Sequence, residues 1–383
     1  MPSERPLLER LGVAYLRWRA ASVAADASEE EDEVHVLNAR EQARLRRVER
    51  GVVLRAALAG GLSALASALA ERWAEASFGA SPETFELGWY ARYWGVVGGV
   101  TLVATLFEIL FLYRDSLEGV HRLSHAAGLR IFEAGDSQSV VASALARAAL
   151  ELPNPLETPY HIDPHREVSK PRLLVATLLY KAKVGLTTFL LKLLLRRLLS
   201  RAAVRVWLVF VSVPVTALWN GVVAFRVVRE ARVRAMGPSA ARDLTARLFA
   251  KAGALTPEGR VAALRAVGAC VVSSFDLHPN HHALLDEVKA RAGEPGDVDL
   301  GDWRALLSDL RTASQEEARL LVSLLGVAAV LDGRLTRRER ALFLDAREAI
   351  GLPREHASLL ELRRAFLRGL PISDAMLDAL ASR

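Results

Sequence analysis

The chain has 383 residues, of which 51% are hydrophobic and 25% are charged, and its formal net charge is +6 at pH 7. This composition excludes a chain that is disordered throughout, and the single cysteine, Cys270, excludes a disulfide-stabilised scaffold. A mean hydropathy of +0.18 is high for a soluble protein with this many charges, whereas a protein embedded throughout in lipid has fewer charges. We therefore expect long apolar segments separated by charged ones.

Three stretches are long and apolar enough to cross a bilayer as helices. They are residues 52–70, 93–113 and 206–225, and about 20 such residues cross a hydrocarbon core of about 30 Å. The alternative is a soluble helical protein, whose core helices usually contain shorter apolar runs. Two features favour the membrane, namely aromatic residues at the ends of the second stretch and small residues that allow close helix packing: Trp89, Tyr90, Tyr93, Trp94 and Tyr113, and Gly60, Ala64, Ser67, Gly95 and Gly99.

A further stretch, residues 173–195, combines leucines with Lys181, Lys183 and Lys192. Lys181 and Lys192 lie on one polar stripe of a helix, so the segment either crosses the membrane with this stripe toward other helices or lies in the interface with the stripe toward water. Glu108 is the one charge of the second stretch, and an intramembrane acid needs a partner. We expect one of these lysines to pair with it and fix the helix register, with an ion or proton path as the alternative.

The arginines indicate the topology. Five of them precede the first stretch, which places the N-terminus in the cytoplasm by the positive-inside rule. We predict an all-α membrane protein of the inner (plasma) membrane with three or four membrane helices and both termini cytoplasmic. Its two hairpins are residues 51–113 and residues 172–232, the second of which has an amphipathic first helix or is an elbow that does not cross fully.

Two further segments lie outside the predicted spans. Residues 1–50 form cytoplasmic N-terminal helices interrupted by an acidic run at 29–33, which is either solvated or masks nearby arginines from anionic lipid. Residues 114–171 form a cytoplasmic helix and then a proline-rich loop. This loop is either a ligand site or a solvated turn, and its candidate ligand residues are Tyr160, His161, Asp163 and His165.

Residues 239–383 are predicted to be a separate helical domain that begins after Pro238. Within it, Thr336 and Glu339 have the spacing of a capping box, and residues 320–352 form a helical hairpin. Residues 261–293 repeat this hairpin weakly at one constant offset along the chain, which predicts two stacked hairpins. The identical pairs are Gly268 and Gly326, Val272 and Val330, Leu277 and Leu335, Ala283 and Ala341, Leu284 and Leu342, and Gly293 and Gly351.

The sequence around Asp332, Gly333 and Glu339 resembles the TerB-like (tellurite-resistance type) helical domain over about the last third of the chain. The resemblance implies an all-helical cytoplasmic module that is attached to membrane proteins and linked to envelope or metal stress. The family's acidic cluster is proposed to bind cations, but four arginines surround the two acids here: Arg334, Arg337, Arg338 and Arg340. We therefore expect ion pairs at this hairpin instead of a metal.

The histidines are the other candidate metal ligands. His121 and His125 lie four residues apart on one helix face, and His278, His281 and His282 cluster at a helix start. Neither group has an evident fourth ligand nearby, and Cys270 is expected to pack as a small apolar side chain. No cofactor is predicted.

Common phosphate-binding, zinc-protease, serine-hydrolase and dinucleotide motifs are missing, so we expect no enzymatic activity. The arginines gather at the ends of the apolar stretches, which argues against nucleic acid binding. The predicted function is a non-catalytic membrane protein that presents residues 239–383 to an unidentified cytoplasmic protein, either as a single chain or as a homo-oligomer. The alternative is an oligomeric ion channel or transporter that uses Glu108 and the lysine stripe.

Overall fold

The computed structural model describes residues 7–23, 35–79, 86–126, 140–150, 162, 209–294, 296 and 298–382. Every regular element in these ranges is a helix, which confirms the all-α prediction. The chain divides into two compact units, unit 1 from residues 1–46, 120–167 and 229–383 and unit 2 from residues 47–119 and 168–228. The lysine-containing stretch 173–195 lies outside the described residues.

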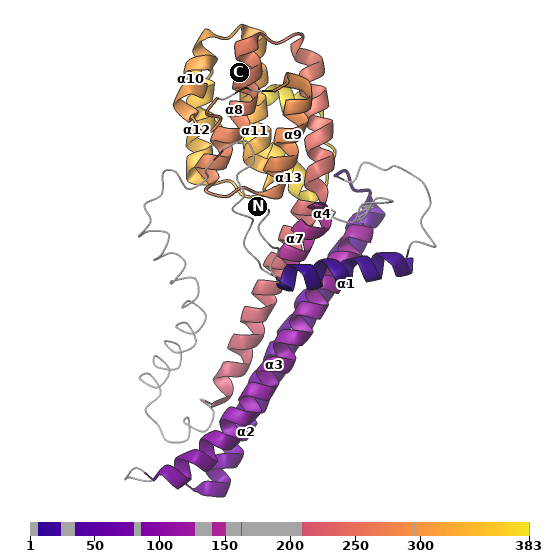
Figure 1. The fold of residues 1–383 in the computed structure, drawn as a ribbon, viewed down its shortest axis with the longest axis vertical. Coiled ribbons are helices and arrows are strands. Elements are labelled where there is room, and N and C mark those ends of the chain that lie inside the picture. The colour runs from indigo at the N-terminus through magenta and orange to yellow at the C-terminus, as the bar shows by residue number, and fades with distance from the viewer. Residues whose placement is uncertain are drawn as a thin grey trace. The chain divides into compact units, whose positions relative to one another are not determined.

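Unit 2 is built on two long helices, α2 (Ala39–Phe78) and α3 (Leu87–Ala126), which lie side by side in opposite directions (Figure 1). At one end Arg55 forms an ion pair with Asp115, with 2.7 Å between Nε and Oδ1. At the other end the indole N–H of Trp89 donates to the Phe78 carbonyl at 2.9 Å. By length and composition both helices could cross a membrane, and no third helix among the described residues meets the same criterion.

Among the described residues, unit 2 also contains the first part of α7 (Ser212–Ala252), which follows the short 3-10 helix η2 (Val209–Val211). It approaches α2 closely at Gly60, where an added Cβ would collide with the Asn220 amide. A Cβ on Gly95 or Gly99 would meet no atom within 4 Å. The small residues of α2 therefore allow close packing, whereas the GxxxG pair of α3 makes no such contact among the described residues.

Unit 1 contains the rest of α7 and a bundle of helices (Figure 1): α8 (Pro257–Ser274), α9 (Pro279–Ala292), α10 (Trp303–Thr312), α11 (Gln315–Leu331), α12 (Arg337–Ala349), α13 (Ala357–Arg368), α14 (Asp374–Asp378) and the 3-10 helix η3 (Ala379–Ala381). The core lies where α8 packs against α11, since both helices are largely buried. Unit 1 also includes α1 (Leu7–Val23) and α4 (Val140–Ala149), joined by a buried ion pair between Glu9 and Arg147.

Pro238 does not begin a new domain, and this part of the prediction is wrong. It lies inside α7, which continues to Ala252. A proline inside a helix removes one backbone hydrogen bond, but Met236, Ala240 and Leu244 on either side are buried. Their packing keeps the helix continuous.

The two predicted hairpins are α8–α9 and α11–α12, and their helix starts agree with the offset of the sequence repeat. Helices α8 and α11 begin at Pro257 and Gln315, and α9 and α12 begin at Pro279 and Arg337. The N-cap residues also correspond: Thr256 with Ser314, and His278 with Thr336. The close contact of α8 with α11 stacks the two hairpins against each other.

Candidate functional site

The turn before α12 has the geometry that its sequence predicts. Gly333 has a φ of 73°, and the Asp332 carboxylate accepts a hydrogen bond from the Arg334 amide at 2.8 Å. The Thr336 hydroxyl accepts from the Glu339 amide, and Glu339 Oε2 accepts from the Thr336 amide at 2.7 Å. The capping box is therefore confirmed. It directs the Glu339 side chain inward, where it is 1% exposed.

Equivalent positions of the two hairpins contact each other across the core. In the register of the repeat, His281 corresponds to Glu339 and Cys270 corresponds to Ala328. His281 Nε2 lies 3.0 Å from the Ala328 carbonyl, and the Cys270 thiol donates to Glu339 Oε1 at 3.5 Å. The second helix of each hairpin thus contacts the first helix of the other hairpin. The residues contacted, Cys270 and Ala328, occupy equivalent positions in the repeat.

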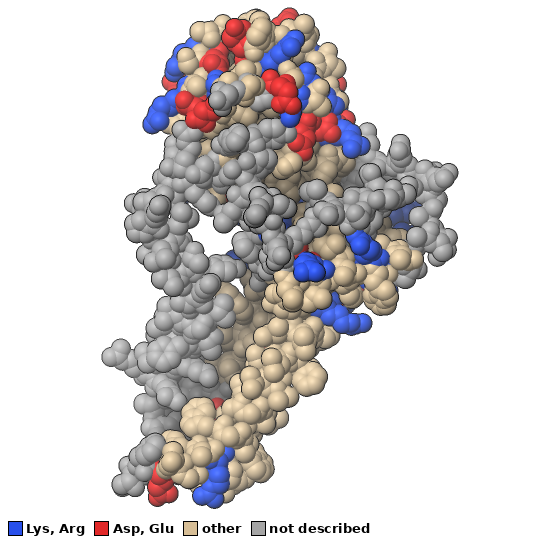
Figure 2. Space-filling model, viewed as in Figure 1, with Lys and Arg blue, Asp and Glu red and all other residues tan. Residues whose placement is uncertain are grey.

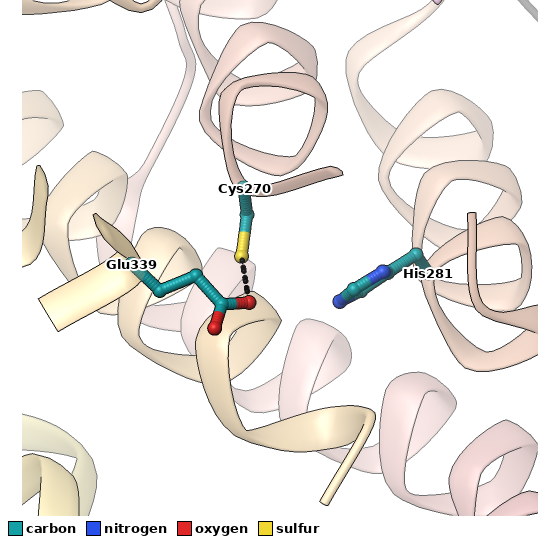
Figure 3. Close-up of side chains that lie close together, drawn as sticks. All are labelled: Cys270, His281 and Glu339. Carbon is teal, nitrogen blue, oxygen red and sulfur yellow. Dashed lines mark hydrogen bonds between the residues drawn. The ribbon is translucent and has the colours of Figure 1, made fainter. Parts of the chain in front are cut away.

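These contacts bring Cys270, His281 and Glu339 together from three helices, and their side chains point toward one another (Figure 3). One ligand-type atom from each residue lies within 4.8 Å of the others, and the three residues are at most 1% exposed. The sequence patterns did not predict this cluster, because they grouped only ligands that are close in sequence. The repeat contained the signal, since it placed a histidine and a glutamate at equivalent positions.

The Cys270–His281–Glu339 cluster is poorly suited to hold negative charge on its own. Burial and then the charge of Asp332 raise the pKa of Glu339 to about 7, and burial also raises the pKa of Asp332. Burial and the nearby Glu339 raise the pKa of the Cys270 thiol well above its ordinary value. His281 Nδ1 is buried without a hydrogen-bond partner. The cluster therefore gathers three donor atoms in surroundings that disfavour their ionised forms.

The expected ion pairs at this hairpin are not formed by the two acids. Among the described residues neither Asp332 nor Glu339 forms one, because both point into the core while Arg337 and Arg338 are exposed. Arg334 instead pairs with Glu230 at 3.2 Å. The hairpin therefore has ion pairs through Arg334, as its arginines led us to expect, but Asp332 and Glu339 do not take part in them.

Glu230 is the centre of a second, partly buried network. His278 Nε2 lies 3.0 Å from its Oε1, and Arg234 forms an ion pair with the same carboxylate. Burial alone would raise the pKa of Glu230, but His278, Arg234 and Arg334 together hold it well below its usual range. Burial lowers the pKa of His278 to about 4. His278 Nδ1 also accepts from the Asn280 amide, so this histidine caps α9 as its neutral form.

The predicted histidine clusters separate in the structure. His278 caps α9, His281 enters the buried cluster, and His282 pairs with Asp286 at 2.9 Å on the surface of α9. On α3, His121 is buried whereas His125 is exposed, and neither belongs to the group of potential ligands found among the described residues.

The other candidate residues divide between described and undescribed parts of the chain. Glu108 accepts a hydrogen bond from the Asn220 amide at 2.5 Å, within unit 2. Its predicted lysine partners lie outside the described residues, as do Tyr160, His161, Asp163 and His165 of the proline-rich loop.

Comparison of the chain with family models, with curated proteins and with solved structures gave no match. The resemblance to the TerB-like domain therefore stays a prediction.

Proposed function

We propose that this chain is a non-catalytic integral membrane protein that holds α2, α3 and the first part of α7 in the bilayer and presents unit 1 to a cytoplasmic protein partner. One observation carries the proposal: the apolar side chains of these helices face outward. Large exposed residues occur along all three, namely Leu54, Leu58, Leu62 and Leu69 on α2, Leu102, Val103, Leu106, Phe107 and Leu110 on α3, and Leu218 and Phe225 on α7.

A core helix of a soluble protein would bury these residues. The most apolar 18-residue windows of α2 and α3 are only 22% and 6% buried, so neither helix is a core helix of unit 2. Figure 2 shows the surface of these helices as a long band almost without charged groups, with acidic and basic side chains at one end. An exposed apolar surface of this size favours contact with lipid.

The ionisable side chains within the apolar runs of these helices, Arg55 and Glu108, have partners, as charged groups in a bilayer require. Arg55 is paired with Asp115, and Glu108 is bonded to Asn220. Aromatic rings lie at the start of α3, where Trp89 stacks on Tyr93 with 4.9 Å between ring centroids. Such rings are typical of a membrane–water interface.

The interaction role of unit 1 is supported by the burial of its reactive side chains. Cys270, His281 and Glu339 are covered by surrounding helices, so a substrate would have no direct access to them. A closed helical bundle attached to a membrane hairpin suits a scaffold better than an enzyme, and the TerB-like resemblance points the same way.

Membrane attachment is tested by alkaline carbonate extraction of membranes that contain the full-length chain. We expect the wild type to stay in the pellet. The double variant Phe107→Arg/Leu110→Arg should lose much of its membrane fraction, because each arginine near the middle of a span costs about 3 kcal/mol. Leu370→Arg places the same charge on an exposed apolar position of unit 1 and should change nothing. Release of the wild type by carbonate would refute the proposal.

Topology and role need separate measurements. In a Cys270→Ser background, a cysteine at Gly79 should react with an impermeant maleimide from outside the cell, and one at Ser382 only after permeabilisation. Ion flux through liposomes containing the purified chain, if abolished by Glu108→Gln, would contradict the scaffold role. A protein crosslinked in cells to the surface of unit 1 would support it.

A further inference from the structure

We propose that Cys270, His281 and Glu339 form a binding site for one divalent metal ion of the zinc type, which joins the two hairpins of unit 1. This inference concerns the core of unit 1 and does not depend on the membrane attachment proposed above.

The separation of the donor atoms suits tetrahedral zinc. Bond lengths of about 2.3 Å to sulfur and about 2.0 Å to oxygen at a tetrahedral angle place the two donors about 3.5 Å apart. The Cys270 Sγ to Glu339 Oε1 distance is 3.5 Å. The three donor atoms lie within 4.8 Å of one another, so a ring nitrogen of His281 must approach by no more than about 1.5 Å to complete the geometry.

His281 is prepared for such a role. Its Nε2 contacts the Ala328 carbonyl at 3.0 Å, and its Nδ1 has no partner although the residue is 0% exposed. A buried polar atom without a partner is costly. A bound metal ion would occupy one ring nitrogen of His281, and metal-bound histidines commonly donate the other to a carboxylate, a backbone carbonyl or water.

The charges of the three ligands balance the ion. A Cys270 thiolate, a Glu339 carboxylate and a neutral His281 sum to −2, so a bound dication makes the buried site neutral. Two adjacent buried anions would otherwise repel each other.

The ligand types select the class of metal. Sulfur together with imidazole nitrogen favours Zn²⁺ and its analogue Co²⁺, whereas Mg²⁺ and Ca²⁺ prefer oxygen ligands alone. The ligands come from α8, α9 and α12, so the ion would connect both hairpins at the centre of the bundle. We therefore expect a structural role.

The test uses the purified full-length protein in detergent, stripped with a chelator and titrated with Co²⁺ and then Zn²⁺. We expect one equivalent of Co²⁺ to bind with a thiolate-to-cobalt charge-transfer band, and one equivalent of Zn²⁺ to displace it. Mg²⁺ should not compete. Binding of less than a tenth of an equivalent of either ion, or binding without the thiolate band, would overturn the proposal.

Variants separate ligation from a general effect on folding. Cys270→Ser should abolish the charge-transfer band, and Glu339→Gln should weaken Zn²⁺ binding at least tenfold. Gln keeps an oxygen that accepts from the Thr336 amide, so the helix cap is retained. His282→Gln alters the adjacent surface histidine and should bind like the wild type. Loss of binding in that control would count against the assigned ligands.

A measurement on the wild type alone guards against variants that do not fold. Zn²⁺ should slow amide hydrogen exchange in α8, α9 and α12 at least tenfold, because bound metal stabilises the folded state that forms its site. Unchanged exchange at saturating Zn²⁺ would refute the structural role.

Discussion

The two hairpins of unit 1, α8–α9 and α11–α12, have equivalent helix starts and N-cap positions but different side chains at the positions where they meet. The second hairpin has Gly333 at its turn and Glu339 at N3 of its second helix, whereas the first has Phe275 and His281. The repeat therefore preserves the backbone and varies the chemistry. Equivalent positions of the two hairpins therefore hold His281 and Glu339, and these two different residues meet Cys270 in one cluster.

The two hairpins also differ at the start of their first helices. Glu317 Oε1 accepts hydrogen bonds from both the amide and the hydroxyl of Thr256 at 2.7 Å, while Oε2 accepts from Ser314. One carboxylate thus caps two helices. The equivalent position in the first hairpin is Gly259, where an added Cβ would contact Glu317 Oε1. The space beside Gly259 is already filled by the Glu317 carboxylate, so only one of the two equivalent positions can be a glutamate.

The largest expected effect is the loss of stability on replacing Asn280, compared with replacing Arg338 at the equivalent position of the second hairpin. The Asn280 side-chain amide donates to the carbonyls of Val233 and Leu331 at 2.9 and 2.6 Å, so Asn280→Ala removes two buried hydrogen bonds. We expect a loss of about 4 kcal/mol in the free energy of unfolding, measured by amide hydrogen exchange of α8 and α11 in the full-length protein. Arg338→Ala, at the exposed equivalent position, should cost less than about 0.5 kcal/mol.

The second effect depends on pH and tests Glu339 in the metal-free protein. Because the folded-state pKa of about 7 lies above the ordinary value of 4.5, ionisation opposes folding, and stability falls as the pH rises from 4.5 through 7. Glu339→Gln cannot ionise. Hydrogen exchange with a chelator present should show the variant gaining about 3 kcal/mol on the wild type between pH 4.5 and pH 8. Parallel pH profiles would show that Glu339 ionises freely in the fold.

The third effect tests the shared cap. Glu317→Ala removes the hydrogen bonds of two N-caps and should destabilise α8 and α11 together by about 2 kcal/mol, as seen in their amide exchange. Glu316→Ala alters the exposed neighbour in the same first turn and should cost less than about 0.5 kcal/mol. If amide exchange increased in α11 alone, the N-cap of α8 at Thr256 would be stable without the hydrogen bonds to Glu317.

The smallest effect concerns the turns. Phe275 has a φ of 59°, a left-handed conformation that the second hairpin assigns to Gly333. Phe275→Gly and Phe275→Ala both lose the ring that lies under the Arg338 guanidinium, but only alanine retains the steric cost of this conformation. Thermal unfolding and amide exchange should find the glycine variant more stable than the alanine variant by about 1 kcal/mol. A more stable alanine variant would mean that the turn relaxes out of this conformation.

Sequence patterns that depend on local spacing predicted their structures well. The capping box of Thr336 and Glu339 forms as expected, and the constant offset of the repeat agrees with the helix starts of both hairpins. The apolar runs correctly indicated α2 and α3 as helices of membrane-spanning length. Pro238 was misleading, because its local tendency to end a helix is outweighed by the packing of the residues around it.

What the sequence by itself determined is therefore the class of each segment: helices, their caps, their apolar lengths and a repeated hairpin. These follow from interactions between residues a few positions apart. Only the tertiary structure decided that Cys270 meets Glu339, that Asn220 bonds Glu108, and that Arg334 pairs with Glu230 instead of the acids beside it. Such partners are set by how helices pack, and side chains far apart in sequence contact each other only where that packing brings them together.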